Sequence, residues 1–128
     1  SMRHGHRLLH IETQHSTKIS VVCSYVDEAI QPMIITGSWD ETIRAWPLSV
    51  TCKRKHHSIN EVTTQASSNS QHYSLTVRES TILNGHTNRI LALKTTSNNE
   101  GRSVHEGPLL VSGSADATLC VWSLKSLT

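Results

Sequence analysis

Short apolar runs, rich in β-branched residues and bounded by Gly, Ser and Asp, follow one another along the chain. Runs of this kind are typical of β-strands. They predict two sets of three strands, at residues 18–26, 32–37 and 42–48 and at residues 89–95, 108–113 and 118–124. Two further runs, residues 7–11 and 76–83, are also strand-like. The pattern therefore predicts an all-β fold.

The two sets of strands share a repeated motif. Residues 34–48 read IITGSWDETIRAWPL and residues 110–124 read LVSGSADATLCVWSL. At a fixed separation of 76 residues, the motifs pair Thr36/Ser112, Gly37/Gly113, Ser38/Ser114, Asp40/Asp116, Thr42/Thr118 and Trp46/Trp122. A histidine precedes the first strand of each set, at His15 and at His86. Since a repeated strand–turn–strand unit indicates an array of similar sheets, we expect function to lie in the surface of the array rather than in reactive groups.

A polar segment separates the two units. Residues 49–71 are rich in Ser, Thr, Asn and His and include the basic residues Lys53, Arg54 and Lys55. We expect a long exposed loop here, because the segment cannot bury enough apolar surface to offset the entropy of ordering. A second polar stretch, residues 97–107, predicts a lengthened hairpin loop. The chain is thus divided into a first repeat at 7–48, an inserted loop at 49–75 and a second repeat at 76–125.

Length and composition narrow the function classes. The chain has 128 residues and a net charge of +2, so overall electrostatics favour neither a nucleic acid nor a membrane as partner. No apolar run approaches the ~20 residues of a membrane span, and no signal peptide is visible. The three cysteines, Cys23, Cys52 and Cys120, are odd in number and widely spaced, which favours a reducing compartment. We therefore expect a cytoplasmic protein, or a nuclear one if the basic residues act as a targeting signal.

The repeated residues resemble those of WD40 repeats. The resemblance rests on the opening Gly-His, the small residues of the middle strand, the turn Asp and the closing Trp, which are Gly85-His86, Ser112-Gly113-Ser114, Asp116 and Trp122 in the second unit. The first unit has Thr36-Gly37-Ser38, Asp40 and Trp46 at the same places. It departs at Gln14, which replaces the opening Gly. The Asp of the Trp-Asp pair is Pro47 in one unit and Ser123 in the other.

The resemblance implies a segment of a β-propeller, in which four-stranded antiparallel blades surround a channel. In that family the opening strand of each sequence repeat forms the outer strand of the preceding blade. Strands 18–26, 33–37 and 42–48, together with residues 76–83, would then make one complete blade. The second unit would supply three strands, and residues 7–11 would be a spare outer strand. The expected fold is all-β, with about two four-stranded blades.

Two blades leave large apolar faces without a neighbour, whereas propellers typically have about 4–8 blades. Three arrangements would cover these faces. The chain is a fragment of a longer propeller, or it closes a ring with copies of itself, or it completes the open propeller of a partner chain. In the last two cases residues 7–11 are a natural donor strand for an unfilled sheet edge.

His86, Ser112 and Asp116 could also form a Ser-His-Asp hydrolase set. The WD40 resemblance implies a structural role instead, in which the Trp indole donates to the Ser or Thr hydroxyl, the hydroxyl to the His, and the His to the turn Asp. The expected networks are Trp46–Thr36–His15–Asp40 and Trp122–Ser112–His86–Asp116. Ser112 lies on a strand, without the strand-to-helix turn that presents a catalytic serine. We therefore expect no enzymatic activity.

The remaining candidate residues concern metals and partners. Two groups, His4, His6 and His10 and also Cys52, His56 and His57, do not match a zinc site with four ligands, so we expect no metal and no cofactor. The candidate protein-binding residues are Trp39, Lys53, Arg54 and Lys55. For Trp39 the alternative is packing against a neighbouring loop, and for the basic residues it is a solvated loop. The predicted function is a non-catalytic protein–protein interaction scaffold. The alternative is an assembly subunit that closes a propeller ring with copies of itself or with a partner chain.

Overall fold

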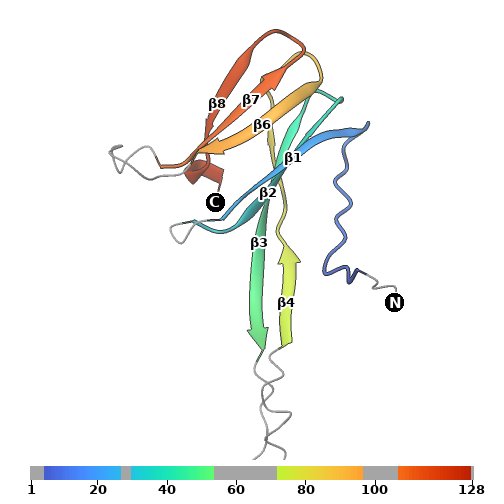
Figure 1. Cartoon of the computed structure of the whole chain (residues 1–128), viewed down its shortest axis with the longest axis vertical. Coiled ribbons are helices and arrows are strands. Elements are labelled where there is room, and N and C mark those ends of the chain that lie inside the picture. Colours follow the sequence, from blue (N-terminus) through green and yellow to red (C-terminus); the bar gives the residue numbers. More distant parts are fainter. Residues whose placement is uncertain (1–4, 27–29, 54–71, 97–106, 128) are drawn as a thin grey trace, which may run out of the picture.

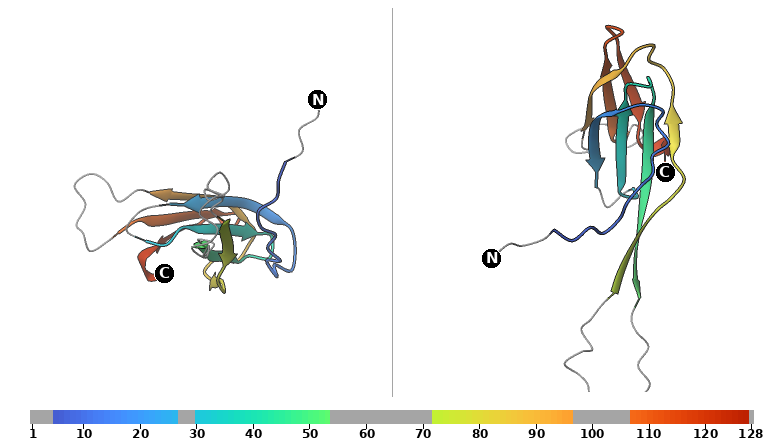
Figure 2. Two further views of the ribbon diagram at one scale, coloured as in Figure 1. Left: turned by 90° about the horizontal axis from the view of Figure 1, so that it is seen from below. Right: turned by 90° about the vertical axis from the view of Figure 1, so that its right-hand side faces the viewer.

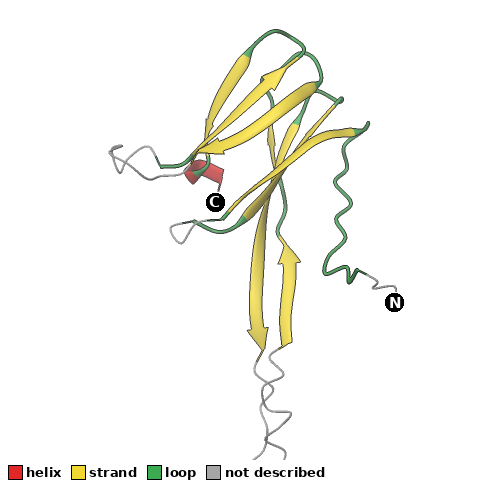
Figure 3. Ribbon diagram, viewed as in Figure 1, coloured by secondary structure: helices red, strands yellow, loops and turns green. Residues whose placement is uncertain are grey.

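A computed structural model of the chain describes residues 5–26, 30–53, 72–96 and 107–127. It contains eight strands, β1 (Ile19–Tyr25), β2 (Met33–Ser38), β3 (Ile43–Lys53), β4 (His72–Val77), β5 (Thr81–Leu83), β6 (Ile90–Thr96), β7 (Leu109–Ser114) and β8 (Leu119–Ser123). The described residues hold no α-helix, only a short 3₁₀ helix at Lys125–Leu127 (Figure 3). The prediction of an all-β fold built from partial blades is confirmed. No described helix has the length and apolar character needed to span a membrane.

The first sheet is antiparallel and follows the order β1-β2-β3, after which β3 pairs with two different strands. Residues 43–45 of β3 pair with β5, and residues 48–53 pair with β4. β1, β2, β3 and β5 thus form a four-stranded blade. The far half of β3 and β4 form a two-stranded arm that projects beyond the sheets (Figure 1).

The second sheet has three antiparallel strands in the order β6-β7-β8. No strand within the described part of the chain pairs with the outer edge of β8. The first strand of each sheet shifts register at the same place, between Ile19 and Val21 in β1 and between Ile90 and Ala92 in β6. The repeat in the sequence is therefore also a repeat in backbone geometry, down to this β-bulge.

Three predicted boundaries were wrong. Residues 7–11 are not a strand and run apart from both sheets (Figure 1), although no described strand pairs with the outer edge of β8. Residues 76–83 are not one strand but the end of β4, a break at residues 78–80, and β5. Residues 49–53 and 72–75, predicted as loop, are paired strand residues, because antiparallel pairing satisfies their backbone groups without a buried side-chain face. The rest of that predicted loop lies outside the described residues.

The core lies between the two sheets, which face each other with β6 against β1 and β2 (Figure 2). Its buried side chains come from both sheets and their flanking loops, and are Tyr25, Met33, Ile35, Ile43, Ala45, Leu83, Ile90, Leu110 and Leu124. Ile90 is fully buried against Gly37 of β2. A Cβ atom at Gly37 would lie 2.6 Å from Cγ2 of Ile90, so the sheets approach this closely only because residue 37 is glycine.

Candidate functional site

The second and third strands of each sheet are joined by the same tight turn. In the first turn, the amide of Ser38 donates to the carbonyl of Thr42 at 3.2 Å, and in the second, the amide of Ser114 donates to that of Thr118 at 3.3 Å. Glu41 and Ala117 occupy equivalent positions with φ of 76° and 69°, in the left-handed region that non-glycine residues rarely adopt. This turn geometry directs the preceding Asp side chain back toward the histidine of the same unit.

In the first unit the structure brings together Trp46, Thr36, His15 and Asp40. The Trp46 indole N–H donates to Oγ1 of Thr36 at 3.1 Å, and Nε2 of His15 lies 2.8 Å from the same oxygen. Nδ1 of His15 lies 2.9 Å from Oδ2 of Asp40. Because the carboxylate only accepts, Nδ1 donates to it, and in the neutral imidazole Nε2 then accepts from the threonine hydroxyl. Each polar group therefore has a partner of the opposite kind.

The second unit repeats this network with Ser112 in the place of threonine. The Trp122 indole donates to Oγ of Ser112 at 3.0 Å, and Nε2 of His86 lies 2.8 Å from that oxygen. Nδ1 of His86 lies 3.0 Å from Oδ2 of Asp116. Two networks with the same connections, built on different hydroxyl side chains, indicate that the hydroxyl oxygen is what each network requires.

One threonine in each turn belongs to the network although the sequence analysis assigned it no role. Thr42 donates to Oδ1 of Asp40 from both its hydroxyl, at 2.6 Å, and its amide, at 2.9 Å. Thr118 makes the same two bonds to Asp116, at 2.5 and 2.8 Å. The signal was present, since these threonines pair at the same separation as the other motif residues.

The turn carboxyls have strongly perturbed pKa values. Burial alone would raise the pKa of Asp40, but the hydrogen bonds from Thr42, His15 and the Ser16 amide outweigh it and hold that pKa well below its usual range. The pKa of Asp116 is likewise lowered well below its usual range. There the Thr118 hydroxyl has the largest effect and burial opposes it, while the amides of Thr87 and Thr118 and the ring of His86 add to the lowering. Both carboxyls therefore stay ionised and act as fixed acceptors.

The geometry does not present a nucleophile. Ser112 has 0% of its surface exposed, and its oxygen is shared between the Trp122 indole and His86. A substrate carbonyl would have to displace the indole to reach it. The arrangement is suited to holding the loop before each first strand against the turn, since His15 and His86 connect those loops to Asp40 and Asp116.

Trp39 lies in the first tight turn, directly before Asp40 of the first network. It is 48% exposed, with the ammonium of Lys18 at 5.1 Å and the guanidinium of Arg89 at 5.3 Å from its ring centroid. Arg89 comes from the second unit, so the ring also spans the junction between the two units. Cation–π contacts at exposed sites contribute about 0.5–1 kcal/mol each. We call Lys18, Trp39 and Arg89 the turn-end surface.

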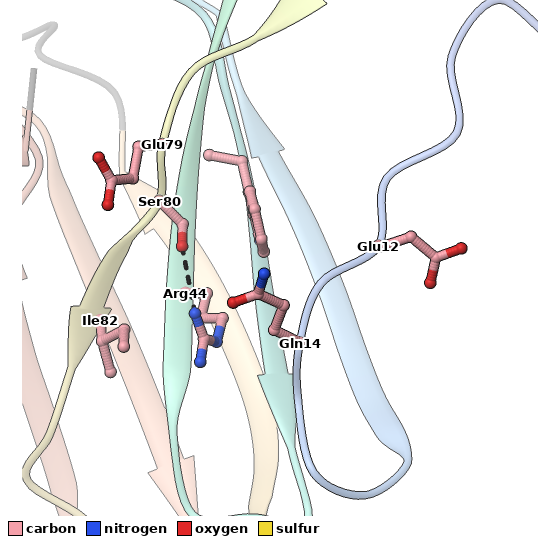
Figure 4. A pocket seen from close by; sticks show the side chains of 7 residues that line it. Glu12, Gln14, Arg44, Glu79, Ser80 and Ile82 are labelled. Carbon is pink, nitrogen blue, oxygen red and sulfur yellow. Dashed lines mark hydrogen bonds between the residues drawn. The ribbon is translucent and has the colours of Figure 1, made fainter.

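An open recess of about 350 Å³ lies against the first blade, beside the N-terminal segment (Figure 4). Its lining residues are Glu12, Gln14, Arg44, Trp46, Glu79, Ser80 and Ile82. Nη1 of Arg44 donates to the Ser80 hydroxyl at 3.4 Å, whereas its buried Nε has no hydrogen-bond partner among the described residues. The second unit has Cys120 at the position equivalent to Arg44. Comparison of the two repeats therefore did not point to Arg44.

Most of the basic candidate residues, and several of the histidines considered as metal ligands, are not among the residues that the structure describes. Arg54, Lys55, His4, His56 and His57 lie outside the described residues. Lys53 ends β3, where its backbone pairs with His72, and Cys52 precedes it in the same strand. The role predicted for the basic residues therefore stays a prediction.

The comparisons with known proteins agree with the repeated geometry. The family model described as WD domain, G-beta repeat, matches residues 6–47 and 77–123. No curated protein and no solved structure matches the chain significantly. The two matched segments contain both networks and both tight turns and cover most of the chain. Its repeats, its paired sheets and its Trp–hydroxyl–His–Asp networks together show that this chain belongs to the WD40 repeat family.

Proposed function

We propose that this chain is a non-catalytic interaction module whose rigid blades hold a binding surface at the turn end. WD40 repeats are generally protein-interaction scaffolds. The observation that supports this role here is the complete use of the Ser, His and Asp side chains within the networks, with Ser112 fully buried. The fold leaves the half-exposed ring of Trp39 accessible at that end, in contact with two cations.

The turn-end surface has the chemistry to bind an acidic peptide segment. The exposed ring of Trp39 offers apolar contact, and Lys18 and Arg89 provide positive charge beside it. Aromatic and arginine side chains are the residue types that most often dominate interface energies. Because the ring is already held by two cations, little further ordering is needed when a partner binds.

Fluorescence anisotropy with labelled peptides tests this proposal. The probes are a series rich in Asp and Glu, each with one Leu or Phe, and a matched series in which the acidic residues are Lys. We expect the acidic series to bind more tightly, and Trp39→Ala to weaken that binding about tenfold, which corresponds to about 1.4 kcal/mol. Val50→Ala, which also removes an exposed apolar side chain but lies on the β3 arm, serves as the control. Equal binding of both series, or no effect of Trp39→Ala, would contradict the proposal.

The hydrolase alternative has its own test. Turnover of an activated ester by the wild-type chain, abolished in a folded Ser112→Ala variant, would overturn the non-catalytic role.

The proposal also includes a reducing location such as the cytoplasm, supported by the free thiols of Cys23 and Cys120. We therefore expect peptide binding at the turn-end surface to be unchanged in millimolar reductant.

A second role, as an assembly subunit, is favoured by one comparison between equivalent residues. Ile19 and Ile90 occupy the same position after the histidine of each unit and beside the same bulge. Ile90 is 0% exposed, whereas Ile19 is 46% exposed. The position is therefore built for burial between sheets, and in the first unit nothing within the described chain buries it.

A further inference from the structure

Within the described residues, each of the two sheets has one face that does not pack against the other sheet. In the first sheet, strand pairing places Val22, Thr36, Arg44 and Ile82 in one row, and so on one face. We call this the leading face, which includes the exposed Ile19. In the second sheet, pairing places Ala92, Gly113 and Leu119 in one row and Val111 and Val121 in the next. We call this the trailing face.

The contact between the two units shows how such faces fit together. Ile90 of the second unit lies over Gly37 of the first. A Cβ at residue 37 would lie 2.6 Å from Ile90 Cγ2 and 2.9 Å from Val21 Cγ1, so glycine is required there. The Ser20 hydroxyl also donates to the Ile90 carbonyl at 2.6 Å. An isoleucine on one sheet and a glycine on the next therefore form the centre of this junction.

The chain carries a second glycine and a second isoleucine that could form this junction but do not. Gly113 is the residue of the second unit that is equivalent to Gly37. A Cβ at Gly113 would meet only Cδ2 of Leu119, at 3.3 Å. The space that Ile90 fills above Gly37 is open above Gly113. Ile19 stands where Ile90 stands, and it is half exposed. The trailing face thus offers the receiving half of a junction, and the leading face offers the inserting half.

We infer that the trailing face of one copy of this chain docks on the leading face of a second copy, with Ile19 inserted over Gly113. This inference rests on the assembly role proposed above. The row Val21–Gly37–Ile43 of the internal junction corresponds to Ala92–Gly113–Leu119 of the trailing face, so the receiving surface stays apolar.

Several side chains on the two faces are close in size to those at the internal junction. On the inserting side, Val22 takes the place of Leu93, and on the receiving side Val121 takes the place of Ala45, so lost and gained volume offset each other. Lys94 stands where Cys23 packs against the core, and its long aliphatic stem can cover apolar surface while the ammonium reaches solvent at the rim. The unpaired Nε of Arg44 lies on the leading face, which a docked copy would cover.

The contact joins different faces of the two copies, so a docked pair keeps one free leading face and one free trailing face for further copies. Such head-to-tail contacts close into a ring when the rotation per copy divides a full turn. With two blades per copy, rings of about 4–8 blades contain about two to four copies.

Sedimentation velocity on the 128-residue chain tests the inference. The variants are Ile19→Glu, which blocks the leading face, and Gly113→Leu, which fills the receiving position of the trailing face. Leu8→Glu is the control, since Leu8 is 74% exposed and lies outside both faces. We expect the wild type and Leu8→Glu to form a closed oligomer of about two to four copies. Each blocking variant alone should be a folded monomer by circular dichroism.

An equimolar mixture of the two blocking variants provides the decisive measurement. Ile19→Glu retains an intact trailing face and Gly113→Leu retains an intact leading face, so the mixture should form one-to-one dimers. A misfolded variant could not form them, which separates loss of docking from loss of folding. A monomeric wild type, an open-ended polymer, a variant that assembles like the wild type, or a mixture that stays monomeric would each overturn the inference. A monomeric wild type would mean that blades other than those of a second copy cover the two faces. The peptide binding at Trp39 would be unaffected by that result.

Discussion

The hydrogen-bond network of the second unit gives a sharp prediction for the substitution of Ser112. Ser112→Ala removes the oxygen that accepts from the Trp122 indole at 3.0 Å and donates to His86 at 2.8 Å. Ser112→Thr keeps that oxygen and adds one methyl group, which reproduces the first unit, where Thr36 makes the same two contacts. Comparing the two substitutions therefore separates the effect of losing the hydrogen bonds on stability from the effect of changing the side chain at residue 112.

The size of the effect follows from the groups left unpaired. An unsatisfied buried donor or acceptor costs about 1–3 kcal/mol. The His86 side chain is only 1% exposed, so its Nε2 has no access to water, whereas the half-buried Trp122 can recover part of its loss. We therefore expect Ser112→Ala to lower the free energy of unfolding by about 2–4 kcal/mol and Ser112→Thr to lower it by less than about 1 kcal/mol.

Urea unfolding followed by far-ultraviolet circular dichroism measures both values. Thr36→Ser provides the matched control in the other unit, and it should also cost less than about 1 kcal/mol because the hydroxyl is kept. A thermal scan should show the same order, with about 2–8 °C for each kcal/mol in a domain of this size. If Ser112→Thr were as destabilising as Ser112→Ala, or if Ser112→Ala changed nothing, the hydrogen bonds of the network would not stabilise the fold.

Two further predictions concern the turn carboxyls and the junction between the sheets. Because the folded-state pKa values of Asp40 and Asp116 lie below the unfolded value of about 3.9, stability should be constant above about pH 5 and fall as the pH is lowered below about 4. Equal urea midpoints at about pH 7 and about pH 3 would show that the carboxyls contribute nothing. Gly37→Ala should destabilise by about 1–3 kcal/mol through overlap with Ile90, whereas Gly5→Ala, with no atom within 4 Å of the added Cβ, should be neutral. Calorimetric melting temperatures compare the two variants, and equal temperatures would argue against a tight junction.

Local structure was largely readable from the sequence. The predicted strands at 18–26, 32–37, 89–95, 108–113 and 118–124 agree with the observed strands to within about one or two residues at each end, the usual uncertainty of such boundaries. The pairing of Trp46 with Thr36 and of His15 with Asp40 was implied by the WD40 resemblance, and the structure contains both pairs. The alternation of apolar and polar residues depends on nearby positions in the sequence, and the repeat shows the same pattern a second time.

Other features depended on neighbours that no local pattern describes. The extension of β3 to Lys53 required β4 as a partner, and residues 7–11, which pair with no strand of either sheet, lack strand structure. The contact between Trp39 and Arg89 joins the two units across the folded structure. Ile19 and Ile90 show the distinction most clearly, since the same residue type at the same place in its repeat is half exposed in one unit and fully buried in the other. The sequence by itself determined the repeating unit, because hydrogen bonding and alternation are local. Only the tertiary structure decided which faces meet, because burial depends on the sheet that packs opposite.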